Sequence, residues 1–228
     1  MFVACHLFIG LILGVVIAAR LGDRRTIGFT ALGGILPDLI DKPVGHILLA
    51  GSLNSGRIVA HGLLFLILLS MAGIALWRWQ RSFALIATTI GVASHQILDT
   101  MWASPVAWYF PLLGPYTPRE FTNYFGNAIL AEISSFSEWI FLFASIGIAL
   151  AAGYTFGRDL SRLGRMLIHV AIPLLVGLIL ASLYAWTTGI SESILMVGAG
   201  PESYLMLAAI GFFGVVVMVR YRNFLGAG

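Results

Sequence analysis

Long apolar runs separated by short polar connections dominate this chain of 228 residues. A membrane-spanning helix needs about 20 mainly apolar residues. Runs of suitable length lie at 2–19, 58–77, 83–102, 136–157, 166–187 and 204–220. The pattern predicts an all-α integral membrane protein that forms a single membrane domain over residues 1–228.

A shorter apolar run occupies residues 26–37 and ends at Pro37. A helix over this run would cover roughly 18 Å, which is less than the thickness of a hydrocarbon core, about 30 Å. The run either continues as a kinked helix through Pro37 or forms a half-span that ends inside the protein. Counted as a short or broken second helix, it brings the predicted bundle to about seven membrane helices.

The positive charges are distributed unevenly among the connections. Arginines gather at 20–25, 78–81, 158–165 and 220–222, whereas the connections 38–57, 103–135 and 188–203 carry only Lys42, Arg57 and Arg119 as cations. By the positive-inside rule, the arginine-rich connections are cytoplasmic. The sequence therefore predicts a multi-pass protein of the cell (inner) membrane, with its N-terminus outside and its C-terminus in the cytoplasm.

Composition supports the membrane assignment and excludes other classes. The chain is 59% hydrophobic and only 10% charged, whereas about 25% of the residues of a soluble domain are charged. No basic patch of the kind that binds nucleic acid is present, so no nucleic-acid partner is expected. Cys5 is the single cysteine, so no intramolecular disulfide can form. Nothing in the sequence indicates an oligomeric state.

Ionisable residues far apart in the sequence reach one level in this topology, just below the outer surface. His95 and Asp99 are four residues apart, so both point from one face of a helix. Charged groups inside a bilayer are costly, and they usually pair, bind a metal or line a cavity. The set comprises His6, Asp38, Asp41, His61, His95 and Asp99, with Glu138 as a further candidate at the start of the run 136–157.

Imidazole and carboxylate ligands in a partly dry pocket favour Zn²⁺ or another first-row divalent ion such as Mn²⁺. A single histidine in a membrane helix is usually a packing residue, but three histidines and three aspartates at one depth favour a metal site. His46 faces either this pocket or the outer aqueous loop, and we favour the loop. The aromatic residues of the stretch 101–116 form either an interfacial belt or a roof over the pocket.

Five short motifs carry a resemblance to a known family. They read "ACHLFIG", "GGILPDLIDKP", "GRIVAHGLL", "SHQILD" and "WYFPLLG" in this order. In these motifs, over about residues 1–115, the chain resembles the YdjM-like family of membrane-bound metal-dependent hydrolases. The resemblance implies a membrane-embedded hydrolase whose metal ligands are His6, Asp38, Asp41, His61, His95 and Asp99. Residues 116–228 would then supply supporting helices.

The chain departs from this family at three positions. Gly56, Ala60 and Gly62 stand where the family carries His, Thr and Ser, so an imidazole and two hydroxyls that can orient metal ligands are missing. A more distant likeness is to zinc-dependent phospholipase C and the zinc-dependent single-strand nucleases, which cleave phosphoesters with a metal cluster. Their downstream histidine ligands have no clear counterpart here, so this likeness implies only one or two ions.

These observations predict metal-assisted hydrolysis of a phosphoester in a membrane lipid or lipid-linked substrate at the outer leaflet. A second ion would be held by His6 with Asp99 as a bridging ligand. The ligands of the first ion would be His61, His95, Asp99 and either Asp38 or Asp41.

The remaining aspartate of that pair is the candidate general base, which takes a proton from water. Arg57 is the candidate clamp for a phosphate oxygen. The alternative for Arg57 is an interfacial arginine that extends its charged group towards water.

Two functions of other classes remain open. A divalent-metal carrier or sensor is one, but the apolar inner stretches "LLFLILLSMAGIAL" and "FALIATTIGV" disfavour a polar path to the cytoplasm. The other is a non-catalytic membrane scaffold with a partly decayed metal site, which the residues Gly56, Ala60 and Gly62 suggest.

Overall fold

The computed structural model describes residues 3–116, 120–153, 158–190, 195–197 and 200–226, and its fold is all-α, as predicted. Arg119 lies outside the described residues. The elements are α1 (Val3–Leu21), α2 (Arg25–Pro43), the π-helical turn η1 (Val44–Leu48), α3 (Leu63–Gln80), α4 (Ala84–Leu98), the 3₁₀ turn η2 (Met101–Ala103), α5 (Pro105–Trp108), α6 (Tyr124–Ser134), α7 (Phe136–Ala152), α8 (Arg158–Thr188), α9 (Pro201–Arg220) and α10 (Arg222–Gly226).

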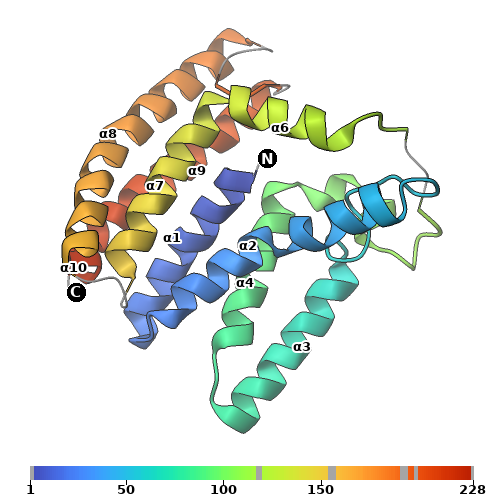
Figure 1. Ribbon diagram of the computed structural model, residues 1–228, viewed down its shortest axis with the longest axis horizontal. Coiled ribbons are helices and arrows are strands. Elements are labelled where there is room, and N and C mark those ends of the chain that lie inside the picture. The colour runs from blue at the N-terminus through green and yellow to red at the C-terminus, as the bar shows by residue number, and fades with distance from the viewer. Residues whose placement is uncertain (1–2, 117–119, 154–157, 191–194, 198–199, 227–228) are drawn as a thin grey trace.

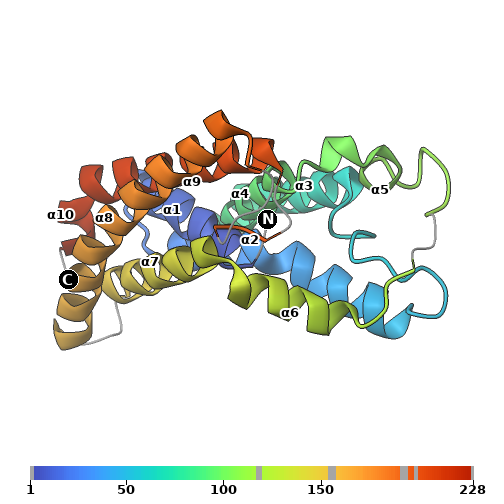
Figure 2. The ribbon, with the colours of Figure 1, turned by 90° about the horizontal axis from the view of Figure 1, so that it is seen from above.

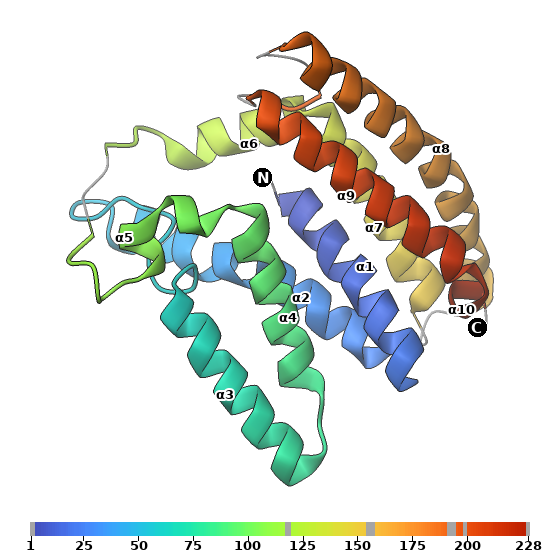
Figure 3. The ribbon, with the colours of Figure 1, turned by 180° about the vertical axis from the view of Figure 1, so that it is seen from behind.

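Helix α1 lies between two groups of helices (Figures 1 and 3). On one side it contacts α2 and α4, and α3 packs on the outside of α4. On the other side it contacts α7 and α9, which pack with α8. Seen from above, α5 lies towards one end of the molecule, and α8, α10 and the C-terminus lie towards the other (Figure 2).

The predicted number of seven membrane helices is wrong. Among the described residues, α1, α3, α8 and α9 are long and apolar enough to cross a membrane. The pair α6 and α7 adds a fifth span only if it is counted as one span, bent by 78°. Helix α4 has only 15 residues, and α2 is not among the helices long and apolar enough to cross a membrane.

Helix α2 settles the question raised by the short apolar run at 26–37. It runs for 19 residues from Arg25 to Pro43 and passes through Pro37 without a break. The run therefore continues through the proline, as the first of the two alternatives predicted. The same helix carries Asp38 and Asp41 in its last two turns, and both carboxylates are buried.

Close contact between helix backbones holds α1, α2 and α4 together. A Cβ atom at Gly34 would lie 2.7 Å from the carbonyl oxygen of His6. A Cβ atom at Gly91 would lie 2.2 Å from the carbonyl oxygen of Thr30. Only glycine allows helices to approach this closely, and the approach brings the ends of the three helices to one place.

Candidate metal centre

The six predicted ligands come from four segments that end or begin at the same place. His6 lies in the first turns of α1, and Asp38 and Asp41 lie in the last turns of α2. His61 directly precedes the residue that caps α3, and His95 and Asp99 lie at the end of α4. All six side chains are buried. The structure therefore brings together residues that are up to 93 positions apart in the sequence.

The two imidazoles of His61 and His95 face each other at the centre of this cluster. The Nδ1 atom of His61 lies 2.8 Å from Asp41 Oδ2, and Nδ1 of His95 lies 2.7 Å from the carbonyl oxygen of Gly34. Because both acceptors need a hydrogen, each neutral ring carries its proton on Nδ1. The two Nε2 atoms, 3.1 Å apart, then present lone pairs to each other. Two lone pairs that face each other repel, and either a shared proton or a metal ion relieves this repulsion.

Two carboxylates flank this pair of imidazoles. Asp38 Oδ1 lies 3.6 Å from Nε2 of His61 and 3.8 Å from Nε2 of His95. Asp99 Oδ2 lies 3.8 Å and 4.0 Å from the same two atoms. Ligand atoms around a tetrahedral Zn²⁺ with bonds of about 2.0 Å are roughly 3.3 Å apart. The donor set and its spacing therefore fit a divalent ion of this kind.

His6 extends the cluster on the side of Asp99. Its Nε2 atom lies 3.2 Å from Asp99 Oδ1, and its ring stacks on that of His95 with centroids 3.9 Å apart. Its Nδ1 atom is buried and has no hydrogen-bond partner among the described residues. Buried polar atoms are almost always hydrogen-bonded. The unpaired Nδ1 atom of His6 is therefore consistent with a bound ion or other ligand beside this ring.

The cluster contains two overlapping groups that could hold a metal ion. One consists of His6, His95 and Asp99, and the other of Asp38, His61 and His95. Both groups use His95, whose Nδ1 atom is already bonded to Gly34. Because one Nε2 atom binds one ion, the two groups cannot both be filled at the same time. The described ligands therefore fit a single ion better than two.

Asp41 has a different environment from the other acids. Its Oδ1 atom accepts hydrogen bonds from the backbone N–H groups of Val59 (3.1 Å) and Ala60 (3.0 Å). Its Oδ2 atom accepts bonds from the N–H groups of Ile58 and His61, both at 3.0 Å, and from the His61 ring. A carboxylate has about four lone-pair sites, so Asp41 has none left for an ion and instead orients His61.

This hydrogen bonding explains a second error of the sequence-based prediction. The segment 58–62 was predicted to begin a membrane helix, with His61 one turn inside it. Instead, α3 begins at Leu63, and Gly62 before it is extended. The N–H groups of 58–61 point at the Asp41 carboxylate rather than along a helix. The buried Asp41 carboxylate therefore keeps residues 58–62 out of the helix that their apolar composition favours.

Two cations pair with the flanking carboxylates. Lys42 Nζ donates to Asp38 Oδ2 at 2.7 Å, and Arg57 Nη2 donates to Asp99 Oδ2 at 2.9 Å. Charge-assisted bonds of this kind fix the orientation of a carboxylate. Arg57 was predicted from the sequence, whereas Lys42 was missed. The signal for Lys42 was present, because it follows Asp38 by four residues on one helix.

A pocket of about 320 Å³ opens over the cluster, and we call it the charged pocket. Its wall includes a side chain from α6, Tyr124, which the sequence did not indicate. His46 was expected in the aqueous loop, but it is buried and stacks on Tyr124 with ring centroids 3.5 Å apart. The residues of this wall used below are Asp38, Lys42, His46, Arg57, Asp99 and Tyr124.

Comparison with protein families identifies the chain. The model of the YdjM inner membrane protein family matches residues 1–185.

The chain belongs to this family.

The match extends well beyond residues 1–115 and takes in α6, α7 and most of α8. Neither the curated proteins nor the solved structures contain a match to the chain.

Gly56 is one of the positions at which the chain departs from the YdjM-like motifs. A Cβ atom there would lie 2.9 Å from His46 Nε2 and 3.4 Å from Cγ of Lys42. The Nδ1 atom of His46 is held at 2.9 Å by the side-chain oxygen of Asn54. An imidazole therefore lies beside position 56 even though residue 56 does not supply it.

Glu138, the further candidate ligand, lies behind the cluster. It is buried in the first turn of α7, and its Oε2 atom accepts a hydrogen bond from the backbone N–H of Cys5 at 3.1 Å. It belongs to neither group that could hold a metal. A carboxylate at a helix N-terminus stabilises that end, so Glu138 fixes the turn of α1 that carries His6.

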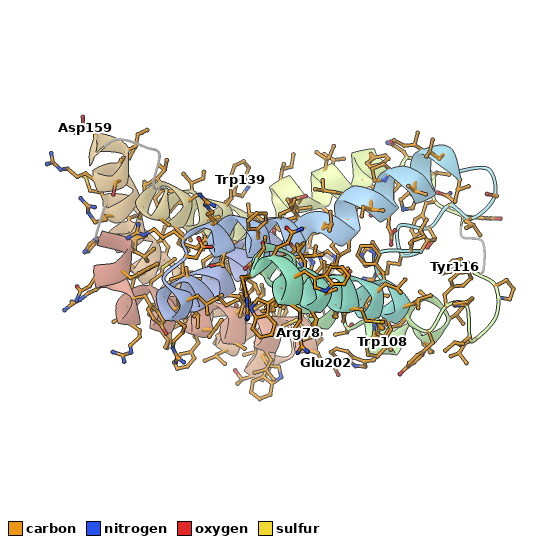
Figure 4. The ribbon with its side chains drawn as sticks, turned by 90° about the horizontal axis from the view of Figure 1, so that it is seen from below. Arg78, Trp108, Tyr116, Trp139, Asp159 and Glu202 are labelled. Carbon is orange, nitrogen blue, oxygen red and sulfur yellow. The ribbon has the colours of Figure 1, made fainter. Side chains whose placement is uncertain are left out.

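The aromatic stretch after α4 lines a second hollow of about 240 Å³, which we call the side pocket. Tyr116 lies in its wall and donates a hydrogen bond to the carbonyl oxygen of Ile58. Burial and the nearby charge of Asp41 raise the pKa of Tyr116 to about 12. Figure 4 shows Tyr116 and Trp108 at one end of the molecule and Asp159 at the other. The stretch lines this side pocket and contributes no residue to the wall of the charged pocket, so the structure does not support the roof alternative.

Proposed function

We propose that this member of the YdjM family is a membrane-embedded, metal-dependent hydrolase that cleaves a phosphoester of a lipid or lipid-linked substrate. The observation that carries the proposal is the pair of Nε2 atoms of His61 and His95, 3.1 Å apart, with both Nδ1 atoms engaged elsewhere. The charged pocket next to this pair supplies the space for a substrate.

In the proposed site His61, His95, Asp99 and His6 hold one divalent ion, with Zn²⁺ as the first candidate. Such an ion acts as a Lewis acid, which lowers the pKa of water and neutralises charge on a phosphoryl group. Asp41 and Gly34 hold the two central imidazoles in the required tautomer through their Nδ1 atoms.

Asp38 is the general base in this proposal. Its Oδ1 atom faces the two imidazoles, and its Oδ2 atom accepts a hydrogen bond from Lys42. Asp41, the other candidate base, has no free lone pair. Asp38 takes a proton from water, the water oxygen bonds to phosphorus, and one P–O ester bond breaks. The departing alkoxide takes up a proton from solvent and Asp38 releases its proton to solvent, so that one water is consumed overall.

Arg57 is the proposed phosphate clamp. A guanidinium has five N–H donors in a rigid fork, so Arg57 can hold Asp99 and still donate to a phosphoryl oxygen. With Lys42 it brings two positive charges to the wall of the charged pocket. The same wall holds three carboxylates, Asp38, Asp99 and Glu132, so the charge of the bound ion is also needed to favour an anionic substrate group.

The location of the site supports a substrate in the outer leaflet. The cluster lies where α1 begins and where α2 and α4 end, whereas Arg20, Arg25 and Arg78 lie at the opposite ends of α1, α2 and α3. By the positive-inside rule the arginine end is cytoplasmic. We therefore propose that the charged pocket faces the extracytoplasmic side.

The test uses the whole chain purified in detergent. Zinc content is measured by mass spectrometry, and release of product from a phospholipid panel is measured with and without a chelator. We expect about one ion per chain and chelator-sensitive hydrolysis. The double substitution His95→Ala, Asp99→Ala should remove both.

The matched control is His169→Ala, because His169 is an exposed histidine of α8 that contacts the carbonyl oxygen of Arg165. This variant should keep its metal and its activity. Equal metal content in wild type and the double variant would overturn the site. Bound metal without hydrolysis of any lipid would instead favour a sensor or scaffold.

A further inference from the structure

The charged pocket and the side pocket meet at the same two residues. Ser55 and Arg57 belong to the walls of both hollows. Arg57 also donates to Asp99, so its guanidinium lies at the edge of the metal cluster. A phosphoryl group bound by Arg57 would therefore lie where the two hollows adjoin.

The two hollows differ in the chemistry of their walls. The charged pocket has Lys42, Asp38 and Tyr124, and the buried His46, whose Nε2 atom has no hydrogen-bond partner among the described residues. The side pocket has no charged side chain except the shared Arg57. Its wall is divided evenly between small or apolar residues, which are Ala103, Pro105, Val106 and Ala107, and polar ones, which are Ser55, Arg57, Ser104 and Tyr116.

The surroundings of the side pocket are apolar and exposed. Trp102 is adjacent to Ala103 in the sequence, and Leu112 and Leu113 follow α5 along the chain. All three side chains are exposed, with Leu112 exposed to 84%. In a membrane protein such side chains contact lipid, and Trp residues lie at the level of the head groups.

We propose that the site takes a phosphodiester with two different arms, and this proposal rests on the proposed function. The phosphate lies at Arg57, the polar head-group arm occupies the charged pocket, and the arm that leads to the acyl chains leaves through the side pocket. A phosphomonoester has only one arm and leaves one hollow without contacts. Hydrolysis converts the diester and one water into a monoester and an alcohol.

The sizes of the hollows agree with this division. Pockets for small molecules usually measure about 300–1,000 Å³. The side pocket, at about 240 Å³, is below this range, and the charged pocket, at about 320 Å³, is at its lower limit. These sizes suit one arm of a substrate in each hollow.

The experiment compares two lipids with the same acyl chains in detergent micelles, using the zinc-loaded wild-type protein. Dioleoyl phosphatidylglycerol is the diester, and dioleoyl phosphatidic acid is the monoester. We expect kcat/KM for the diester to exceed that for the monoester by about tenfold or more, because contacts of the second arm contribute to the transition state.

A substitution in the side pocket completes the test. Ala103 is exposed and lines the hollow, so Ala103→Trp fills it without disturbing a core. This variant should keep its zinc and lose about tenfold in kcat/KM for the diester. Leu180→Trp adds the same ring at an exposed site of α8 outside both pockets and should leave kcat/KM unchanged.

Three outcomes count against the proposal. Faster cleavage of the monoester overturns it and leaves the hydrolase function intact. Normal diester cleavage by Ala103→Trp also overturns it. Cleavage of neither lipid, with zinc bound, overturns the proposed function and this proposal together. The wild-type comparison does not depend on any variant folding.

Discussion

The helices around the metal cluster and the helices α7 and α8 bury polar side chains in different ways. In the cluster, each buried carboxylate contacts an imidazole or a backbone N–H group, and the unpaired buried atoms of its described residues are ring nitrogens of His6 and His46 that face a ligand site. In α7 and α8, the buried hydroxyls of Ser137, Ser145 and Ser182 have no hydrogen-bond partner among the described residues. Substitutions in the cluster should therefore affect several residues at once, whereas substitutions in α7 and α8 should act singly.

Backbone packing gives the largest expected difference between the two regions. Gly91→Ala would place a methyl group 2.2 Å from the carbonyl oxygen of Thr30, so α2 and α4 must separate. We expect a loss of about 3 kcal/mol in the free energy of unfolding, together with loss of bound zinc. Thermal unfolding in detergent and metal analysis measure the two effects.

The control is Gly177→Ala in α8, where a Cβ atom would meet nothing within 4 Å. This substitution should be neutral or should stabilise the helix by up to about 1 kcal/mol. Equal stability of the two variants would show that the close approach of α2 and α4 is not required.

Asp41→Asn gives the second largest expected effect. The asparagine amide keeps only one oxygen as an acceptor. Some of the backbone N–H groups of residues 58–61, or the N–H of the His61 ring, therefore lose their hydrogen-bond partner. Loss of a residue that orients a metal ligand typically costs about 10- to 100-fold in metal affinity. Competition with a zinc chelator measures this affinity.

Asp159→Asn at the exposed start of α8 is the matched control and should leave zinc affinity unchanged. If the Asp41→Asn variant binds zinc as tightly as wild type and is equally stable, Asp41 does not orient His61 for metal binding.

Tyr116→Phe gives the smallest expected effect. It removes the hydrogen bond from the tyrosine hydroxyl to the carbonyl oxygen of Ile58 and should cost about 1 kcal/mol of stability. Because the pKa of Tyr116 is raised to about 12, the hydroxyl stays protonated at pH 7–9 and the cost should be the same across this range. Tyr184→Phe, at an exposed site on α8, should cost nothing measurable by the same thermal unfolding. A cost for Tyr116→Phe that changes between pH 7 and pH 9 would contradict this account.

The sequence was sufficient for the all-α class and for the convergence of the six polar residues. Hydropathy locates apolar helices, and the alternation of arginine-rich connections places His6, His61 and His95 at one level. Hydropathy did not reveal where helices end. The segment 58–62 is apolar enough for a membrane helix, but a single carboxylate, Asp41, determines its backbone conformation through hydrogen bonds.

The wall of the charged pocket was the least predictable part of the site. Tyr124 reaches it from α6, a helix that the apolar pattern did not indicate as a separate element. His46 reaches it through the π-helical turn η1, which alters the direction of its side chain relative to a regular helix. Such turns leave no clear pattern in a sequence. The positions of Tyr124 and His46 in the pocket wall therefore become visible only in the tertiary structure.

The space at Gly56 has a consequence for how the family can vary. A side chain at position 56 would begin 2.9 Å from Nε2 of His46, so a large residue there requires the His46 ring to move or a smaller residue at position 46. A relative with histidine at position 56 should have a smaller residue at position 46. The two positions then form a compensating pair, in which evolution can move one imidazole between two points of the backbone while the pocket stays the same.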